Sequence, residues 1–251
     1  MPHIIYGIHP VKEALASSSC LEKIIVGKQP LHAPLQSILD LASQKNIPIT
    51  YADPKRLDQL ARGGVHQNIL AITREPLYAD LTDLLSHWRA QKAKALFLIL
   101  DCIQDPQNFG SLIRTALGCG AQGIIVPKDR AAGITPVVVK ASAGATAHLL
   151  IARVVNIART IEALKEEGLW VYGASGEATD VVYDLDFTID LAIVIGAEEK
   201  GIRPLVKQRC DRLFSIPMKG PVSSFNVSVS GGMILYEAMR QRHLARGSIQ
   251  P

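Results

Sequence analysis

Short apolar strands alternate with amphipathic helices along most of this chain, and this alternation is the feature that most restricts its fold. Ala95–Leu100 and Leu191–Ile195 are continuous apolar runs, which is typical of strands buried on both faces of a parallel sheet. Helical patterns such as Asn108–Leu117 follow the strands. Because parallel strands need crossover connections, the pattern predicts an α/β fold with a mostly parallel sheet and helices on both faces.

The N-terminal part of the chain has a pattern of its own. It contains three short predicted strands with helices between them, and Arg74–Tyr78, which includes Pro76, has the composition of a linker. We therefore expect a small α/β domain at 1–74, a linker and connecting helix at 75–95, a larger domain at 96–244 and a tail at 245–251.

Charge and cysteine usage narrow the class of protein. The net charge is +4, and residues 1–95 contain 11 Lys and Arg against 8 Asp and Glu, so most of the excess positive charge is N-terminal. No apolar run reaches the length of a membrane span, and the first residues lack the pattern of a signal peptide. The four cysteines are far apart, which favours reduced thiols in a cytoplasmic protein over disulfides or a zinc site.

One glycine motif, taken alone, indicates an enzyme that binds a dinucleotide such as NAD. Gly118–Gly123 matches G-x-G-x-x-G, the dinucleotide-binding fingerprint. That fingerprint needs a strand before it and a helix after it, whereas here a helix precedes it and a strand follows. A helix-to-strand turn is the better interpretation, and an NAD enzyme is the weakest alternative.

Three polar, glycine-bearing loops follow predicted strands: Asn108–Gly110, Gly196–Gly201 and Pro217–Asn226. Ligands of open α/β sheets bind beyond the carboxyl ends of strands. Each loop also has an ordinary structural explanation, since Asn108 can cap a helix and Glu198 can complement a helix dipole. A functional pocket becomes the better interpretation if the three loops converge, and spacing alone does not show convergence.

The last helix, from about Asn226 to Leu244, contains Gly231 and Gly232 side by side. Each costs roughly 1 kcal/mol of helix stability relative to Ala. The pair therefore predicts a close approach of another backbone or of a ligand. Ser223, Ser224 and Asn226 lie ahead of this helix, where their side chains can cap its first N–H groups.

The three loops resemble, in order and spacing, the three motifs of the SpoU/TrmH family of RNA ribose 2'-O-methyltransferases, which belongs to the SPOUT superfamily. The residues that carry the resemblance are Asn108-x-Gly110-x-x-x-Arg114, Gly196-x-Glu198-x-x-Gly201 and Ile216-Pro-Met-x-Gly-x-x-x-Ser224-x-Asn226. The resemblance covers about 96–244. Phe225 stands where we expect Leu.

The N-terminal part resembles the small, ribosomal-protein-like RNA-binding domain of one subgroup of this family. Tyr6-Gly-Ile-His-Pro-Val and Gly64-Val-His-Gln carry this resemblance, and Asn68 stands where we expect Gly. The subgroup methylates a guanosine of the large-subunit (23S) rRNA. The resemblance therefore implies ribosomal RNA as the partner of this chain, with the N-terminal domain selecting it.

The family resemblance implies a fold, a cofactor and a site. The larger domain is expected to form a deep trefoil knot, to bind S-adenosyl-L-methionine and to act as a homodimer, with no metal and no membrane partner. The implied catalytic residues are Asn108, Arg114, Glu198, Ser224 and Asn226, and the implied cofactor contacts are Gly196, Ile216 and Phe225.

In this family an arginine has been assigned as the base that removes the proton, and Arg114 is the matching residue here. A guanidinium has a pKa above ~12 and is not readily deprotonated in a protein. We hypothesise instead that Arg114, held by Asn108, clamps an RNA phosphate bidentately and fixes the 2'-oxygen, while phosphate or water accepts the proton. Two further alternatives are methylation of tRNA by the same chemistry and a non-catalytic RNA-binding protein with this fold.

Overall fold

The structure is a computed structural model of the chain, and it describes residues 3–16, 21–28, 33–73, 78–221 and 224–245. The chain forms two compact units. Unit 1 contains residues 1–77 together with 133–148, and unit 2 contains residues 78–132 and 149–251.

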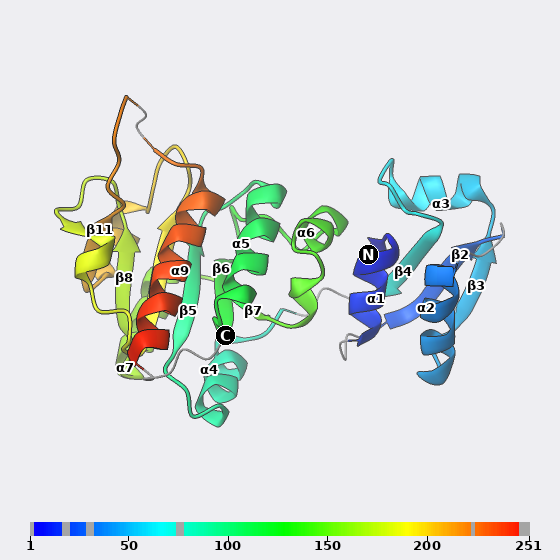
Figure 1. Cartoon of the computed structure of the whole chain (residues 1–251), viewed down its shortest axis with the longest axis horizontal. Helices are drawn as coiled ribbons and strands as arrows, with labels where there is room; N and C mark the ends of the chain where they lie inside the picture. Colours follow the sequence, from blue (N-terminus) through cyan, green and yellow to red (C-terminus); the bar gives the residue numbers. More distant parts are fainter. Residues whose placement is uncertain (1–2, 17–20, 29–32, 74–77, 222–223, 246–251) are drawn as a thin grey trace. The chain divides into compact units, whose positions relative to one another are not determined.

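Unit 1 contains a four-stranded sheet in the order β1-β4-β2-β3 (Figure 1). Strand β4 pairs antiparallel with β1 and β2, and β2 pairs parallel with β3. Its elements are β1 (His3–Tyr6), α1 (Ile8–Ala16), β2 (Leu21–Gly27), α2 (Ala33–Gln44), β3 (Ile49–Ala52), α3 (Pro54–Ala61), β4 (Ile69–Thr73), α6 (Pro136–Ala141) and the 3-10 helix η1 (Ala145–Ala147).

A turn before β4 explains the asparagine that replaces the expected glycine. Asn68 has a φ of 66°, in the left-handed region that glycine favours and that asparagine tolerates better than most other residues. Its backbone N–H donates to Nδ1 of His66 (3.0 Å), and Oε1 of Gln67 accepts the N–H of Ile8 at the start of α1 (2.9 Å). The turn therefore keeps its conformation with Asn68 and also caps α1.

The segment 133–148 is part of unit 1 and is less helical than its composition predicts. We expect one helix over 137–149, but α6 ends at Ala141, where Ala143 and Gly144 take positive φ angles of 50° and 86°. At Gly144 a Cβ would lie 2.4 Å from Cγ of Glu13, so only glycine allows α1 this close. Oε2 of Glu13 also lies 2.8 Å from Nε2 of His148.

Unit 2 is built on a seven-stranded sheet in the order β7-β6-β5-β10-β8-β11-β9. All pairings between these described strands are parallel, which confirms the predicted α/β class with a mostly parallel sheet. The strands are β5 (Leu96–Asp101), β6 (Gly123–Pro127), β7 (Leu150–Val154), β8 (Trp170–Ala174), β9 (Asp180–Val181), β10 (Leu191–Gly196) and β11 (Arg212–Ser215).

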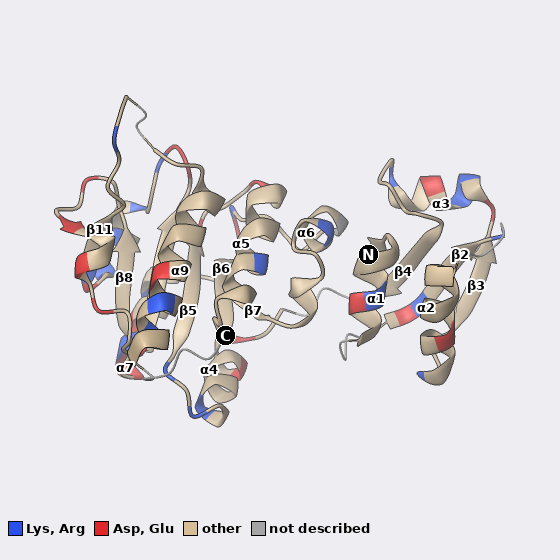
Figure 2. Cartoon of the chain, viewed as in Figure 1, with Lys and Arg blue, Asp and Glu red and all other residues tan. Residues whose placement is uncertain are grey.

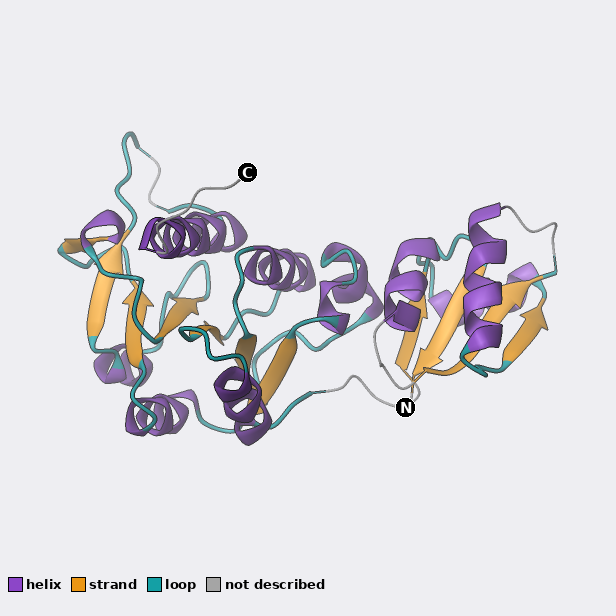
Figure 3. Cartoon of the chain, turned by 60° about the horizontal axis from the view of Figure 1, so that its bottom comes forward, coloured by secondary structure: helices purple, strands orange, loops and turns teal. Residues whose placement is uncertain are grey.

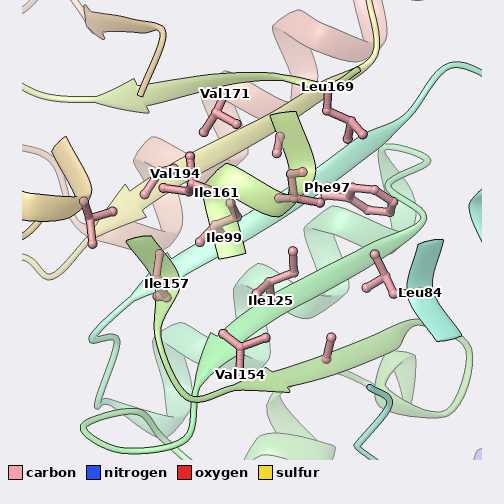
Figure 4. Close-up of a cluster of buried hydrophobic side chains, with 14 of the residues drawn as sticks. Leu84, Phe97, Ile99, Ile125, Val154, Ile157, Ile161, Leu169, Val171 and Val194 are labelled. Atoms are coloured by element: carbon pink, nitrogen blue, oxygen red, sulfur yellow. The ribbon is translucent and has the colours of Figure 1, made fainter. Parts of the chain in front are cut away.

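Helices cover both faces of this sheet (Figure 3). On one face α4 (Leu81–Ala90), α7 (Ile157–Glu166) and α8 (Pro204–Arg209) bury an apolar cluster that includes Phe97, Ile125 and Val194 (Figure 4). On the other face α5 (Pro106–Gly118) packs against α9 (Val227–Ala245). The short 3-10 helix η2 (Val182–Asp184) follows β9.

Arg242 near the end of α9 is structural. Its guanidinium donates to the backbone carbonyls of Lys94 (2.9 Å), Ala95 (2.6 Å), Phe187 (2.8 Å) and Ile189 (2.7 Å). These carbonyls lie at or near the starts of β5 and β10. Arg242 therefore fastens α9 to the sheet and is not available to RNA.

None of the described helices is long and apolar enough to cross a membrane. Within the same part of the chain, no three His, Cys, Asp or Glu side chains gather as metal ligands would.

Candidate functional site at the carboxyl edge of the sheet

The loops after β5 and β10 leave the sheet side by side. The two strands are neighbours, and their last residues, Asp101 and Gly196, are paired. Helix α9 begins beside the same loops, because the backbone N–H of its first residue, Val227, donates to Oε1 of Glu198 (3.2 Å). Chain segments about 100 residues apart in the sequence therefore meet at one point.

Glu198 is the centre of this point. Its Oε1 accepts hydrogen bonds from Nδ2 of Asn226 (2.5 Å) and from Nδ2 of Asn108 (3.1 Å). Nδ2 of Asn226 also donates to Oδ1 of Asn108 (3.1 Å). One residue from each predicted loop takes part, so the three loops do converge. We call Asn108, Glu198, Asn226 and the Val227 N–H the Glu198 cluster.

Helix capping explains why Asn226 is held in this position. Its Oδ1 accepts from the backbone N–H groups of Ser228 (3.0 Å) and Val229 (3.4 Å), which are free donors of the first turn of α9. The expected cap by Ser223 lies outside the described residues. At α5 the cap differs from expectation, because Asp105 accepts the N–H of Asn108 (2.7 Å) and Asn108 lies inside the helix.

Arg114 and Ser224 are exposed and lie outside the Glu198 cluster. Asn108 does not hold Arg114 as expected, and its amide bonds instead to Glu198 and Asn226. Arg114 makes no hydrogen bond or ion pair with another described residue. Its guanidinium, on the exposed face of α5, is therefore free to bind a ligand.

All three predicted cofactor contacts, Gly196, Ile216 and Phe225, line a small cavity of about 150 Å³. Ser224 and Glu198 also line it. Gly196 is required by packing, since a Cβ there would lie 2.0 Å from the carbonyl carbon of Gly201 and 2.2 Å from the nitrogen of Ile202. The cavity has room for roughly ten groups the size of a water molecule, which is the size of a purine base.

A larger cavity of about 460 Å³ adjoins the small one, and Ala197, Glu198, Gly201 and Val227 line both. Its wall also includes Asn108, the loop from Cys102 to Asp105, and Arg130. Burial and the adjacent Asp101 carboxylate raise the pKa of the Cys102 thiol, which disfavours a nucleophilic thiolate. Because the two cavities share part of their walls, they can receive two ligands that meet at the Glu198 cluster.

An ion pair that the sequence motifs do not predict lies beneath this wall. Asp101 is fully buried, and its carboxylate accepts from Nε (2.7 Å) and from the backbone N–H (2.8 Å) of Arg203. The pair ties the end of β5 to the start of α8 and so fixes the shape of the loop between β10 and α8. A carboxylate that ends an otherwise apolar buried strand was the signal in the sequence.

Two protein-family profiles match the chain. The profile of the SpoU rRNA Methylase family matches residues 95–236, and a profile described as RNA 2'-O ribose methyltransferase substrate binding matches residues 4–79. The first match includes every residue of the Glu198 cluster.

Individual proteins resemble the chain over nearly its whole length. Putative TrmH family tRNA/rRNA methyltransferase YacO of Bacillus subtilis is 41% identical over 95% of this chain and 96% of YacO. The 23S rRNA (guanosine-2'-O-)-methyltransferase RlmB of Coxiella burnetii is 41% identical over 95% of both chains. The crystal structure of the SpoU methyltransferase AviRb from Streptomyces viridochromogenes, in complex with AdoMet, has a TM-score of 0.81 at 26% identity and covers 96% of this chain and 90% of AviRb.

Proposed function

The chain belongs to the SpoU rRNA methylase family, and we propose that it transfers a methyl group from S-adenosylmethionine to the 2'-hydroxyl of a guanosine ribose in 23S rRNA. The similarity to RlmB over nearly the full length of both chains supports this substrate. The structural observation that carries the proposal is the position of the Glu198 cluster, where two cavities meet. A methyl transfer needs its donor and acceptor to meet in this way.

The small cavity fits part of the cofactor. Gly196, Ile216 and Phe225 supply a mostly apolar wall of the size that an adenine ring needs, and the larger cavity is left for a nucleotide. We propose these three residues as the cofactor contacts. When bound, S-adenosylmethionine supplies a methyl group that its sulfonium has already activated.

The protein's part in the reaction is alignment. Holding two reactants in the right geometry can lower a barrier by ~7–11 kcal/mol in favourable cases. We propose that Glu198 fixes the amides of Asn108 and Asn226, and that Asn226 and Ser224 face the reacting ribose. As the 2'-oxygen bonds to the methyl carbon, the bond from that carbon to sulfur would break and release S-adenosylhomocysteine, and the hydroxyl proton would pass to the RNA phosphate or to water. Arg114 stays charged and clamps the phosphate.

We further propose that the C-terminal third of unit 2 forms the deep trefoil knot. Two observations support it: the backbone of 201–202 passes against Gly196 with no room for a Cβ, and after β11 the chain returns to Glu198 before α9 packs on α5. An experimental structure whose backbone contains no knot would refute this proposal.

The N-terminal domain, expected at 1–74, is proposed to select the RNA. Its Lys and Arg side chains suit phosphate contacts, although Figure 2 shows acidic residues among them on α1, α2 and α3. The substrate-binding profile over residues 4–79 supports this role. We propose that the protein acts in the cytoplasm, where its substrate is made.

We also propose that the protein is a homodimer that pairs through α9. Val229, Met233 and Tyr236 lie on one face of this helix and are 46%, 42% and 61% exposed. An apolar stripe of this kind is typical of a surface that another protein covers.

Methylation of defined transcripts tests the proposed reaction. The protein is incubated with S-adenosylmethionine labelled in its methyl group and with either 23S rRNA or tRNA transcripts, while calorimetry measures cofactor binding. We expect label in 23S rRNA alone, as a 2'-O-methylguanosine. Label in tRNA would favour the tRNA alternative. RNA binding without cofactor binding would show a non-catalytic protein.

A further inference from the structure

The larger cavity contains an arginine that the proposed mechanism does not use. Arg130 follows β6, is exposed and lines the cavity together with Asn108 and Glu198. Its guanidinium makes no hydrogen bond or ion pair with the residues that the structure describes. A guanidinium is always charged and offers five N–H donors, so an anionic ligand is its natural partner.

The other charged groups of the wall differ from Arg130. Arg203 is bound to Asp101, Asp105 caps α5, and Oε1 of Glu198 accepts three hydrogen bonds. Glu199 and Lys200, of opposite charge, also line the cavity. Arg130 therefore differs from Arg203, the other arginine of the wall, in that its guanidinium has no hydrogen-bonding or ion-pair partner among the described residues.

The backbone around Arg130 is fixed at both ends. The N–H of Lys128 donates to the carbonyl of Val154 (2.7 Å), and the N–H of Ala132 donates to the carbonyl of Ile103 in the cavity wall (2.8 Å). Arg130 itself has a φ of 59°, in the left-handed region that arginine rarely adopts. Strained residues of this kind gather at ligand sites, where the strain positions a side chain.

We propose that Arg130 binds the backbone phosphate beside the target nucleotide and thereby places its ribose at the Glu198 cluster. This inference rests on the proposed function, because it assumes an RNA substrate in the larger cavity. The cavity has room for a nucleotide, and the planar fork of an arginine matches two phosphate oxygens, which a lysine does not. Arg130 is thus a positioning residue for the RNA, separate from Arg114 on α5.

The first test substitutes Arg130 without straining the fold. Glycine suits a φ of 59°, so Arg130→Gly should unfold at a denaturant concentration no lower than the wild type. We expect cofactor affinity to be unchanged, kcat/KM for a 23S rRNA fragment to fall about 10- to 100-fold through KM, and Arg130→Lys to restore only part of it. The slope of a plot of log affinity for RNA against log salt concentration should become shallower by about 1.

The matched control is Arg159→Ala, which removes an exposed arginine of α7 and should change none of these values.

The second test identifies the phosphate. Methylphosphonate, which is uncharged, replaces each phosphate next to the target nucleotide in turn in a synthetic fragment. At one position the wild type should lose as much affinity as Arg130→Gly does, and the variant should lose nothing more. Additive losses at every position, or an Arg130→Gly variant that behaves like Arg159→Ala, would overturn the inference. Binding is measured separately from turnover, so Arg130-dependent binding without methyl transfer would contradict the proposed function while supporting the role of Arg130.

Discussion

A single carboxylate organises the candidate site. Oε1 of Glu198 accepts hydrogen bonds from Asn108 of α5, from Val227 of α9 and from Asn226, which directly precedes α9. Charge-assisted hydrogen bonds of this kind are roughly twice as strong as neutral ones. The cluster therefore fixes side chains on both sides of the junction between the two cavities before any ligand binds.

The position of Arg114 bears on the choice between a base and a clamp. Arg114 is exposed and is not bound to Asn108, so its guanidinium is free to contact a ligand. We predict that Arg114→Lys, which keeps the charge and loses the bidentate fork, lowers kcat at least 10-fold while cofactor affinity measured by calorimetry stays the same. Near-normal turnover of Arg114→Lys would refute the bidentate role.

At the scale of elements, the apolar strands β5 and β10 were predictable because both of their faces are covered by helices. The contacts between loops were not. Asn108 bonds to Glu198 because β10 inserts beside β5, and this order of strands leaves no mark on local spacing. The contact that we expect between Asn108 and Arg114 is not formed, and Asn108 bonds instead to Glu198 and Asn226.

The two adjacent glycines of α9 differ in how closely other atoms approach them, and their spacing in the sequence does not predict this difference. A Cβ on Gly231 would lie 2.3 Å from Cδ2 of Leu112 on α5, and Leu112 is fully buried, so it has little room to move. A Cβ on Gly232 would lie 3.9 Å from Cγ2 of Thr115, an ordinary contact. A close approach therefore does occur at Gly231, but a side chain of α5 makes it and not the backbone or ligand that we expect, and Gly232 is not needed for it within the described chain.

This difference predicts opposite effects from the same substitution. Gly231→Ala should lower the free energy of unfolding by about 1–3 kcal/mol through overpacking. Gly232→Ala should raise it by up to about 1 kcal/mol, because alanine favours the helix. Urea denaturation of both variants at one protein concentration measures the two values. Equal losses from both variants would contradict this account of the α5–α9 contact.

At the scale of the whole molecule, the apolar stripe of α9 predicts the oligomeric state. Met233→Arg places a charge in the middle of the stripe and should shift the protein from dimer to monomer in analytical ultracentrifugation. Val155→Arg is the matched control, because Val155 is 85% exposed and lies away from α9, before α7. A wild-type monomer, or a dimer that Met233→Arg leaves intact, would contradict pairing through α9.

The packing of segment 133–148 within unit 1 affects how the role of this unit in RNA selection should be tested. Val138, Val139 and Ala145 of the segment 133–148 are buried, and α6 and η1 pack against α1 and β1 in the same unit. Deleting residues 1–74 would uncover these side chains as well as remove RNA contacts. Substitution of exposed lysines such as Lys55 separates the two effects, since it leaves the packing unchanged.

The proposed reaction has one direct readout in the cell. In a strain that lacks this protein, one guanosine of 23S rRNA should lose its 2'-O-methyl group, and mass spectrometry of rRNA fragments locates it. The wild-type gene should restore the methyl group, and a gene encoding Glu198→Ala should not. Unchanged ribose methylation of 23S rRNA in the deletion strain would contradict the proposed function.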